Sequence, residues 1–564
     1  MPRKLSGKSS YISKSEKPQC HIHDKALNRD LDDIHQNVCV SEIEFPLAEY
    51  TDGKHYCLFH LPTKDKDPDL FGKTFKKRFH LVEEKIVEVE NLSEEKRTDA
   101  KNNINYDFRY VWFPSNIELK GYRFGVEADF SSTTFSALAL FDSATFIAVA
   151  NFNSVTFHSP VTFESTNFLG SAYFGSATFF DSAVFAFAKF SAYSTFRNTV
   201  FVDQANFLGT TFNSVYFDSA TFLSIALFRK SVFLDRAEFK SSTFVFVTDF
   251  GWANFTETSQ VFFEQTNFCS TVDLSYALFA GYVIFGGEKD KAVFLDEASA
   301  EKTLQNFTFE GKSIHDFLSD YQLKNLHIAL DLQNARLEKP ERIAFHRVRL
   351  CPSWFINVDS RKIVFTDVMW DSFNSKRPKA NIQIELKSLE KQRVREPRRL
   401  LEIAYRQLAN NAEENGRYEE ASKFRLMASE TKRLEYYRGW KVWSLHWWYW
   451  LSSFYGESWI RASIILLILV LLIFPLIYTT RLFQVCPSDK PVSVSLVEHN
   501  CTQKYLEMFD GSALLQSLST ATFQTIEYRK PVTGWGELWI TLEKIFAPLQ
   551  FALLALAIRR KFMR

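Results

Sequence analysis

The chain of 564 residues is nearly neutral and poor in cysteine, and each shortage excludes a class of protein. Its 67 Lys and Arg residues against 66 Asp and Glu residues leave a formal net charge of +1, so the chain has no overall bias toward nucleic acid or acidic partners. Seven cysteines scattered over this length do not form a disulfide framework. We therefore expect no nucleic-acid partner and no disulfide-rich secreted fold.

The sequence also lacks the marks of a leader peptide and of an enzyme. Residues 1–18 are polar and basic with no apolar core, which predicts a disordered tail, here extended to residues 1–40, rather than a signal peptide. No nucleophile–base constellation, phosphate-binding loop or compact pair of carboxylates stands out. We therefore do not expect an enzyme.

What the chain has in excess is phenylalanine, and more than half of its 57 Phe residues recur at a regular spacing. Between Phe108 and Phe285 a large apolar residue lies at every fifth or sixth position, giving 33 centres of which 31 are Phe. A small or β-branched residue, such as Ala150 or Ala205, precedes most centres by two positions. Because positions i−2 and i point the same way in an extended segment, each short face sends one small and one large side chain inward. The pattern predicts a chain that turns a corner every five residues.

Units such as Ala150-Asn151-Phe152-Asn153-Ser154 resemble the motif of the pentapeptide-repeat family in its Phe-centred variant. The resemblance implies a right-handed quadrilateral β-helix over residues 101–295, a mainly β solenoid with four faces per coil. The 33 centres then make about eight coils, or ~38 Å at a strand spacing of ~4.8 Å. Two irregular steps, at 212–217 and 255–263, predict a local bulge or loop.

Members of this family that imitate DNA have an acidic surface, which this chain does not share. Residues 108–285 contain 14 acidic and 9 basic residues, a net of 5 negative charges. Duplex DNA carries one charge per ~1.7 Å of helix axis, which is far more than this segment offers over the same length. We do not expect DNA mimicry.

A small N-terminal module over residues 41–100, together with the tail, carries two Cys-x-x-His pairs, Cys20 with His23 and Cys57 with His60. Two thiolates and two imidazoles at this spacing predict a tetrahedral Zn²⁺ site. The 33 residues between the pairs exceed the separation in compact zinc modules, which favours the alternative of a partly ordered polar segment with reduced thiols. Zinc is the only cofactor that the sequence suggests.

The residues after the repeat form two segments of different predicted structure, the first strand-like and the second helical. Residues 296–380 are expected to be an irregular β extension or cap, because residues 340–371 alternate loosely like strands and an open solenoid end exposes unpaired edges. Residues 381–438 have a helical period and predict two helices joined around Asn415-Gly416. The Tyr418–Ala421 run resembles a tetratricopeptide-type hairpin, so this adaptor either packs on neighbouring domains or docks a protein.

The C-terminal region predicts two membrane-spanning helices. Residues 462–480 form an uncharged run of 19 residues, and residues 538–558 form a second, less apolar span that carries Glu543 and Lys544. Before the first span, the Trp-rich residues 439–461 suit a helix at the headgroup level. Basic residues precede the first span and fill the tail at 559–564, so both termini are expected in the cytoplasm.

The loop between the spans, residues 481–511, is then expected outside the cytoplasm. It contains Cys486 and Cys501, which makes a disulfide plausible there and nowhere else in the chain.

After the loop, residues 512–533 are too short to span the bilayer and must return to the same side, which predicts a re-entrant segment. This layout resembles the two-helix pore domain of potassium channels, and Thr522, Gln524, Thr525 and Glu527 occupy the place of the filter. No Gly lies between residues 512 and 533, so the usual potassium filter is not expected, and a non-selective or vestigial pore remains open. Glu543 and Lys544 in a membrane helix are expected to face protein or water, and Glu527 is the better candidate for a charged ring at a pore mouth. The alternative is that all three lie near the outer interface.

The whole layout resembles bacterial pentapeptide-repeat membrane proteins and implies a multi-pass protein of the bacterial cytoplasmic (inner) membrane. Two hypotheses follow from it. In the first, the β-helix is a docking or scaffold module for an unknown protein partner, tethered to the lipid bilayer. In the second, the chain is one subunit of a homo-oligomeric, ion-channel-like pore, with the β-helix as a cytoplasmic sensor or gate.

Overall fold

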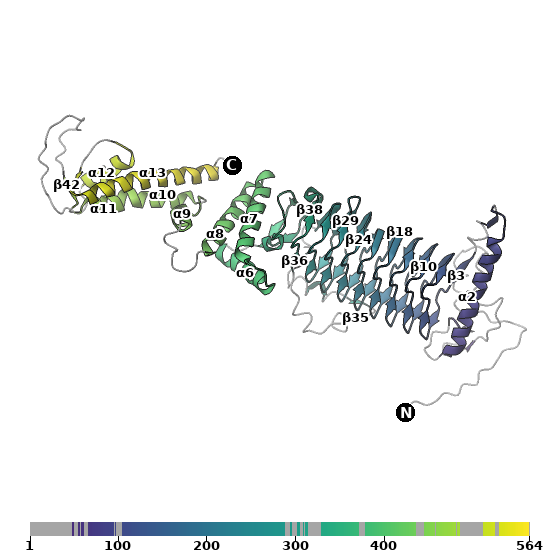
Figure 1. Cartoon of the computed structure of the whole chain (residues 1–564). Helices are drawn as coiled ribbons and strands as arrows, with labels where there is room; N and C mark the ends of the chain where they lie inside the picture. Colours follow the sequence, from purple (N-terminus) through teal and green to yellow (C-terminus); the bar gives the residue numbers. More distant parts are fainter. Residues whose placement is uncertain are drawn as a thin grey trace, which may run out of the picture. The chain divides into compact units, whose positions relative to one another are not determined.

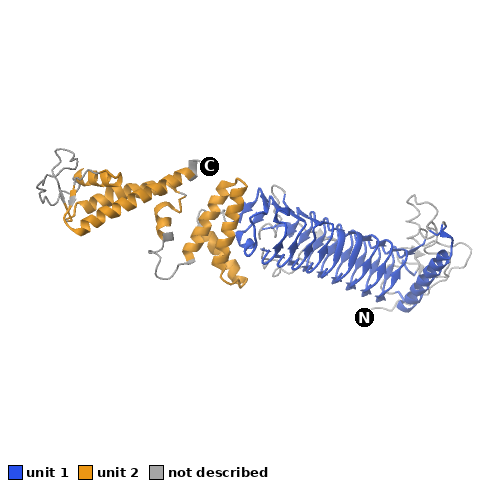
Figure 2. Cartoon of the chain, turned by 45° about the horizontal axis from the view of Figure 1, so that its top comes forward, with its two compact units in different colours: residues 1–374 blue, residues 375–564 orange. Residues whose placement is uncertain are grey.

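The computed structural model divides the chain into two compact units, residues 1–374 and 375–564, which are coloured separately in Figure 2. It describes residues 66–94, 104–287, 329–371, 378–435, 445–456, 458–480, 482–485, 511–524 and 529–562, with shorter pieces at 48–49, 55–56, 58–60, 96–97, 294–295, 302–304, 308–309 and 311–313.

The first unit is a parallel β-solenoid, as the repeat predicts, but it has about 11 turns between residues 105 and 370 rather than eight, because the ladder continues past the regular Phe spacing. Its strands stack in parallel rows along the unit (Figure 1). A residue pairs with the one 22 positions later in most of the ladder, as Thr145 does with Asn167, so four faces of five or six residues complete one turn. Main-chain hydrogen bonds therefore run between turns and leave each turn dependent on its neighbours.

Two of the four faces are separate sheets. One consists of β4 (Trp112–Phe113), β8 (Thr134–Phe135), β12 (Thr156–Phe157), β16 (Thr178–Phe179), β19 (Val200–Phe201), β22 (Thr221–Phe222), β26 (Thr243–Phe244) and β30 (Asn267–Phe268). The other, which we call the D face, consists of β5 (Ile117–Glu118), β9 (Ala139–Leu140), β13 (Val161–Thr162), β17 (Ala183–Val184), β20 (Ala205–Asn206), β23 (Ala226–Leu227), β27 (Thr248–Asp249), β31 (Val272–Asp273) and β36 (Leu330–Asp331).

The remaining two faces are joined into one 18-stranded sheet by two long strands, β18 (Lys189–Thr195) and β21 (Thr211–Tyr216). One face adds β6 (Arg123–Phe124), β10 (Thr145–Phe146), β14 (Asn167–Phe168), β24 (Val232–Phe233), β28 (Asn254–Phe255), β32 (Leu278–Phe279) and β37 (Arg336–Leu337). The other adds β3 (Asn105–Asp107), β7 (Glu127–Asp129), β11 (Ala150–Asn151), β15 (Ala172–Tyr173), β25 (Arg236–Glu238), β29 (Gln260–Glu264), β33 (Tyr282–Gly286), β38 (Ile343–His346) and β40 (Val364–Thr366).

The repeated Phe residues fill the interior, as their spacing predicts. Phe174 is fully buried and stacks on Phe152 and Phe196, with ring centroids 5.0 and 4.8 Å apart and planes within 2°. It meets Phe185 edge-on at 5.4 Å and 88°. Stacked rings along the axis and edge-to-face rings across it are both favoured aromatic arrangements. The small residue two positions earlier, Ala172 in this turn, is also fully buried and leaves room for the rings.

Both irregular steps coincide with local departures from the regular ladder. The step at 212–217 is one residue shorter than the alternation requires, and the register between β18 and β21 accordingly shifts between Phe190 and Tyr193. At 255–263 two extra residues form a corner loop that leaves no room for a side chain at Gly281. Lys339 forms an ion pair with Glu257 in this loop. The expected bulge and loop are thus both present.

The parallel ladder continues beyond the regular Phe spacing. β33 pairs with β38, and Phe345 stacks on Phe285 with ring centroids 5.0 Å apart. The 3₁₀ turns η3 (Pro340–Arg342) and η4 (Pro352–Phe355) and the pair β39 (Arg349–Leu350) with β41 (Met369–Trp370) complete this part. Short antiparallel pairs lie at β1 (Ala48–Glu49) with β2 (His55–Tyr56) and at β34 (Thr308–Phe309) with β35 (Lys312–Ser313).

A helix that sequence reasoning did not identify covers the N-terminal end of the solenoid. The N-cap of α2 (Pro68–Glu90) is Asp67, whose side chain accepts hydrogen bonds from the main-chain N–H groups of Asp69 and Leu70. Its Phe71 packs on Phe113, the first inward Phe of its face, with ring centroids 5.3 Å apart. Figure 1 shows α2 lying across this end, where it shields rings that have no preceding turn.

The second unit is helical. α6 (Pro378–Lys391), α7 (Pro397–Glu414) and α8 (Tyr418–Glu435) form the adaptor, and α7 and α8 meet at Gly416, whose φ of 71° suits the turn. The expected helix pair around Asn415-Gly416 is confirmed. α9 (Leu445–Ser453) precedes a continuous helical stretch of α10 (Trp459–Ile468), the π-helical turn η7 (Leu469–Ile473) and α11 (Phe474–Tyr478). α12 (Gly511–Ala521), β42 (Phe483–Val485) paired with β43 (Arg529–Pro531), and α13 (Gly534–Phe562) complete the unit.

Candidate functional site

Two helices of the second unit are long and apolar enough to cross a membrane, at Trp459–Tyr478 and Gly534–Arg559. The second helix contains the predicted span 538–558, and the first contains all but the last two residues of the predicted span 462–480. Only 22% of each apolar window is buried within the chain, so most of the apolar surface of both helices faces outward. We treat the two helices with α12 between them as the first candidate site.

α12 is held against both long helices by a buried polar cluster around Glu543. Glu543 on α13 is fully buried and accepts hydrogen bonds from the hydroxyls of Tyr478 on α11 and Ser517 on α12. One carboxyl group therefore joins three helices. No cation forms an ion pair with Glu543 among the residues that the structure describes.

The π-helical turn explains how Ser517 finds a second partner. In η7 the N–H of Phe474 bonds to the carbonyl of Leu469 rather than to that of Val470, which frees the carbonyl of Val470. Ser517 Oγ lies 2.8 Å from this carbonyl oxygen and also contacts Glu543. Ser517 therefore ties α12 to the freed carbonyl of η7 as well as to Glu543 of α13.

The segment that returns from α12 is tied to the same cluster by Arg529. Its main-chain N–H donates to Gln516 Oε1 at 2.9 Å, and its Nε donates to Ser512 Oγ at 3.1 Å. Its guanidinium also donates to the carbonyl of Tyr478 at the end of α11. The entry and exit of the α12 segment thus lie at the same end of the long helices, as a re-entrant segment requires.

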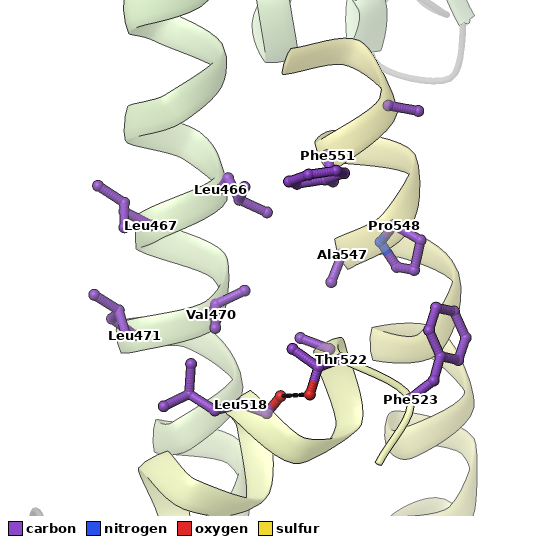
Figure 3. Close-up of a pocket in the computed structure, with 12 residues that line it drawn as sticks. Leu466, Leu467, Val470, Leu471, Leu518, Thr522, Phe523, Ala547, Pro548 and Phe551 are labelled. Atoms are coloured by element: carbon purple, nitrogen blue, oxygen red, sulfur yellow. Dashed lines mark hydrogen bonds between the residues drawn. The ribbon is translucent and has the colours of Figure 1, made fainter. Parts of the chain in front are cut away.

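The C-terminal end of α12 lies beside the middle of the long helices. Thr522 and Phe523 line an apolar groove of about 370 Å³ together with Leu466, Leu467, Val470, Leu471, Leu518, Ala521, Ala547, Pro548, Phe551 and Ala552. Figure 3 shows these side chains on the two long helices around the end of α12. The hydroxyl of Thr522 donates back to the carbonyl of Leu518 at 2.7 Å, so it is used within the helix.

The residues predicted at the filter position are only partly described. Thr522 and Gln524 are exposed at the end of α12, while Thr525 and Glu527 lie outside the described residues. Cys486 and Cys501, the predicted disulfide partners, also lie outside them. Lys544 is exposed on α13, next to the buried Glu543. Glu543 faces protein, which is one of the two positions expected for a charged residue within an apolar run, but its partners on the other two helices were not predicted.

The Trp-rich segment joins the adaptor to the first long helix. The ring of Trp450 on α9 lies between two guanidinium groups, Arg433 of α8 at 4.8 Å and Arg461 of α10 at 4.7 Å from its centroid. Arg433 also donates to Glu430 at 2.9 Å, and Tyr455 donates to the same carboxylate at 3.1 Å. Burial and the neighbouring charge of Glu430 raise the pKa of Tyr455 well above its usual range, which keeps it a donor.

Of the four predicted zinc ligands, only His60 falls within the described residues, because Cys20, His23 and Cys57 lie outside them. His60 is buried, and its Nε2 lies 3.0 Å from the carbonyl oxygen of Arg109 at the start of the solenoid. Within the described part of the chain, no group of three or more His, Cys, Asp or Glu residues is placed to hold a metal ion.

The outer surface of the solenoid is the second candidate site. Two of the four corners in each regular turn hold a residue with positive φ, and Ser or Asn fills many of these positions, such as Ser154 and Ser176. Three corners in one row instead hold large aromatic residues, Phe187, Trp252 and Tyr276, with φ between 58° and 60°. Their side chains are 50%, 50% and 47% exposed. A bulky residue in this conformation is strained, and the interior gains nothing from an exposed ring.

Comparison of this chain with models of protein families, with curated proteins and with solved structures finds no match. The assignment of function therefore depends on the geometry of the two candidate sites.

Proposed function

We propose that this chain is an integral membrane protein of the pentapeptide-repeat type, whose cytoplasmic β-solenoid is a docking rod for another protein. The observation that carries the proposal is the row of exposed aromatic residues Phe187, Trp252 and Tyr276 on strained corners of an otherwise regular rod. Exposed aromatic side chains are typical of protein-recognition surfaces. A solenoid with a stacked aromatic interior presents such a surface rigidly.

The membrane attachment is supported by the distribution of polarity in the second unit. Apolar side chains such as Leu467, Leu476 and Phe551 are more than half exposed, whereas Glu543 and Gln550 are buried. This distribution suits a lipid surrounding, in which polar groups must find partners inside the protein. We place the membrane as the bacterial inner membrane with both termini in the cytoplasm, from the basic residues beside both spans.

Site-specific photocrosslinking in membranes of cells that make the protein tests the docking function. A benzophenone amino acid replaces Trp252 in one variant and Tyr110 in the other, which is an exposed aromatic corner residue of a different row. We expect a partner adduct of one defined mass from position 252 and a much weaker one from position 110. Equal adducts from both positions, or none from position 252, would contradict the docking function.

A second function, an oligomeric pore subunit with the solenoid as sensor or gate, is favoured by the position of the end of α12. Thr522 and Phe523 are exposed beside the middle of both long helices. Irregular backbone at the depth of a bilayer is tolerated only where protein covers it or water reaches it. A symmetric assembly of several copies, with these ends around a central axis, supplies both conditions.

The pore is tested by the mass of the protein in nanodiscs and by its conductance in planar bilayers. An oligomer whose currents change with Glu527→Gln is the expected result. A monomer without conductance would exclude the pore and leave the docking function untouched.

A further inference from the structure

The outward row of the D face changes abruptly in its last turns. In β9, β13, β17, β20 and β23 the outward residue of each pair is uncharged, namely Leu140, Thr162, Val184, Asn206 and Leu227. In the next three strands it is Asp249, which pairs with Asp273, which pairs with Asp331. Parallel pairing places successive carboxylates about 4.8 Å apart along the rod. Three like charges in line repel one another.

The exposed aromatic pair follows this row directly. Trp252 lies three residues after Asp249 and Tyr276 lies three residues after Asp273, both at the corner that ends the D face. Their rings are stacked in parallel, with centroids 4.7 Å apart and planes within 6°. The faces of Trp and Tyr attract ammonium and guanidinium groups. The acidic row and the aromatic pair therefore favour the same kind of ligand.

The chain itself supplies a cation to the first carboxylate of the row but not to the others. Arg229, at the corner of the preceding turn, places Nη1 3.5 Å from Asp249 Oδ2. One and two turns later, the position equivalent to Arg229 holds Gly251 and Ser275, which have no charge to offer. No cation of the described residues forms an ion pair with Asp273 or Asp331.

The free oxygens of these two carboxylates favour an organic cation. Oδ1 of Asp273 accepts from the N–H of Ser275 at 2.8 Å, and Oδ1 of Asp331 accepts from the N–H of Gln333 at 2.9 Å. One oxygen of each group is thus used within the corner, and the other is left for a single donor such as a Lys or Arg side chain.

We propose that Asp273, Asp331, Trp252 and Tyr276 form a docking surface for an extended, basic segment of a partner protein. Two Lys or Arg side chains of the segment pair with Asp273 and Asp331, as Arg229 pairs with Asp249, and the segment passes over the stacked rings of Trp252 and Tyr276. This proposal rests on the docking function above and assigns the chemistry of the partner.

The test uses the full chain in nanodiscs of zwitterionic phosphatidylcholine, so that lipid does not attract the probe. The probe is a fluorescent peptide of ten residues that alternates Lys or Arg with Ser, and its binding is measured by fluorescence polarisation at low salt. A peptide of equal length with Gln in place of every basic residue is the control probe. We expect the basic peptide to bind and the Gln peptide not to bind, with affinity falling as salt rises.

The matched variants change the same charge at two places on the rod. Asp273→Asn with Asp331→Asn should weaken binding roughly ten-fold or more, and Trp252→Ala should weaken it several-fold. Asp235→Asn with Glu264→Gln removes two exposed carboxylates beside β25 and β29, away from the D face, and should leave binding unchanged. The melting temperature of each variant shows that the solenoid is still folded.

Equal weakening by both double variants would mean non-specific attraction and would overturn the proposal, as would unchanged binding in the D-face variant. Absence of binding of the basic peptide to the wild-type chain would contradict the proposal that the partner segment is basic. In that case the docking function itself still stands if position 252 crosslinks in membranes and position 110 does not, so the two failures are distinguishable.

Discussion

The interior of the solenoid and the interface between the long helices differ in the polar groups that they bury. Inside the solenoid, fully buried Phe rings such as Phe152 and Phe174 stack from turn to turn, and the buried polar groups are small hydroxyls such as that of Thr199. In the helical unit the buried residues include Gln516, Ser517 and Glu543, while many Leu, Ile and Phe side chains face outward. This is the difference that the proposed membrane attachment requires. Water drives apolar groups inward in the first unit, whereas lipid around the second would leave hydrogen bonding to select its interior.

The largest effect should come from removing one ring of the aromatic interior. Phe174→Ala deletes a fully buried side chain that contacts rings in both adjacent turns, so the free energy of unfolding should fall by about 3–5 kcal/mol. Phe174→Leu should cost under about 1.5 kcal/mol, because the fold already accepts Leu274 at an inward position. Denaturant unfolding followed by circular dichroism measures both values.

The matched control for this prediction is the exposed ring of Phe187, which is 50% exposed at its corner. Phe187→Ala should change the free energy of unfolding by about 0.5 kcal/mol or less. If Phe187→Ala costs as much as Phe174→Ala, the stack of rings is not what stabilises the solenoid.

The helical unit should respond to the loss of a polar group instead. Glu543→Leu leaves the hydroxyls of Tyr478 and Ser517 without their buried acceptor and should cost about 2 kcal/mol or more. Glu543→Gln keeps an acceptor oxygen for these hydroxyls and should cost less than about 1 kcal/mol. Thermal unfolding of the full chain in nanodiscs measures the two effects.

Lys544→Leu is the control, because Lys544 is exposed on the same helix and its loss should not destabilise the unit. A cost for Glu543→Gln equal to that of Glu543→Leu would show that the charge of the carboxylate, and not its hydrogen bonds, holds the three helices.

A smaller effect should come from removing one of the hydroxyls that the solenoid buries. Thr199 is fully buried, and its Oγ1 donates at 2.7 Å to the carbonyl oxygen of Phe174. Thr199→Val should cost about 1 kcal/mol, the usual net value of one hydrogen bond, and Thr199→Ser should recover most of it. Unchanged stability in Thr199→Val, measured by denaturant unfolding, would mean that packing alone fixes these positions and would sharpen the contrast between the units.

Much of this fold could be predicted from the sequence because the Phe spacing equals the number of residues in each face of the solenoid. Each inward ring is a local consequence of five or six residues, so the four faces and both irregular steps follow from counting. The end of the solenoid was harder to place, since Phe345 continues the stack only after an excursion of the chain between β33 and β36. α2 was missed, although Phe71, Phe75 and Phe79 are spaced like one helical face, because the rings they cover belong to later residues.

The candidate sites were less predictable because their residues are far apart in the chain and meet only in the folded structure. Glu543 stands out in an apolar run, but its partners Tyr478 and Ser517 are 65 and 26 residues away in the chain. The aspartates of the D face are separated by 24 and 58 residues, and only the strand register brings them into line. Contacts that depend on register between distant turns leave no local pattern in the sequence.

The smallest effect concerns the acidic row at the end of the D face. Burial raises the pKa of Asp331, the hydrogen bond from Gln333 opposes this rise, and the charge of Asp273 adds to it. An acid whose pKa is higher in the folded state destabilises the fold when it is ionised, above that pKa. The penalty disappears as the pH falls through the raised value toward the ordinary pKa of Asp near 4.

Asp331→Asn should therefore raise the melting temperature slightly at pH 7, by a stability gain of about 0.5 kcal/mol or less, with no gain at or below pH 4. Differential scanning calorimetry at the two pH values measures the difference, and Asp235→Asn, on an exposed corner, should show neither the gain nor its pH dependence. A loss of stability at pH 7 would mean that Asp331 is held by a favourable partner within the chain. A gain would mean that the row lowers the stability of the rod, and a basic partner that binds there would then recover that stability by pairing with the charge.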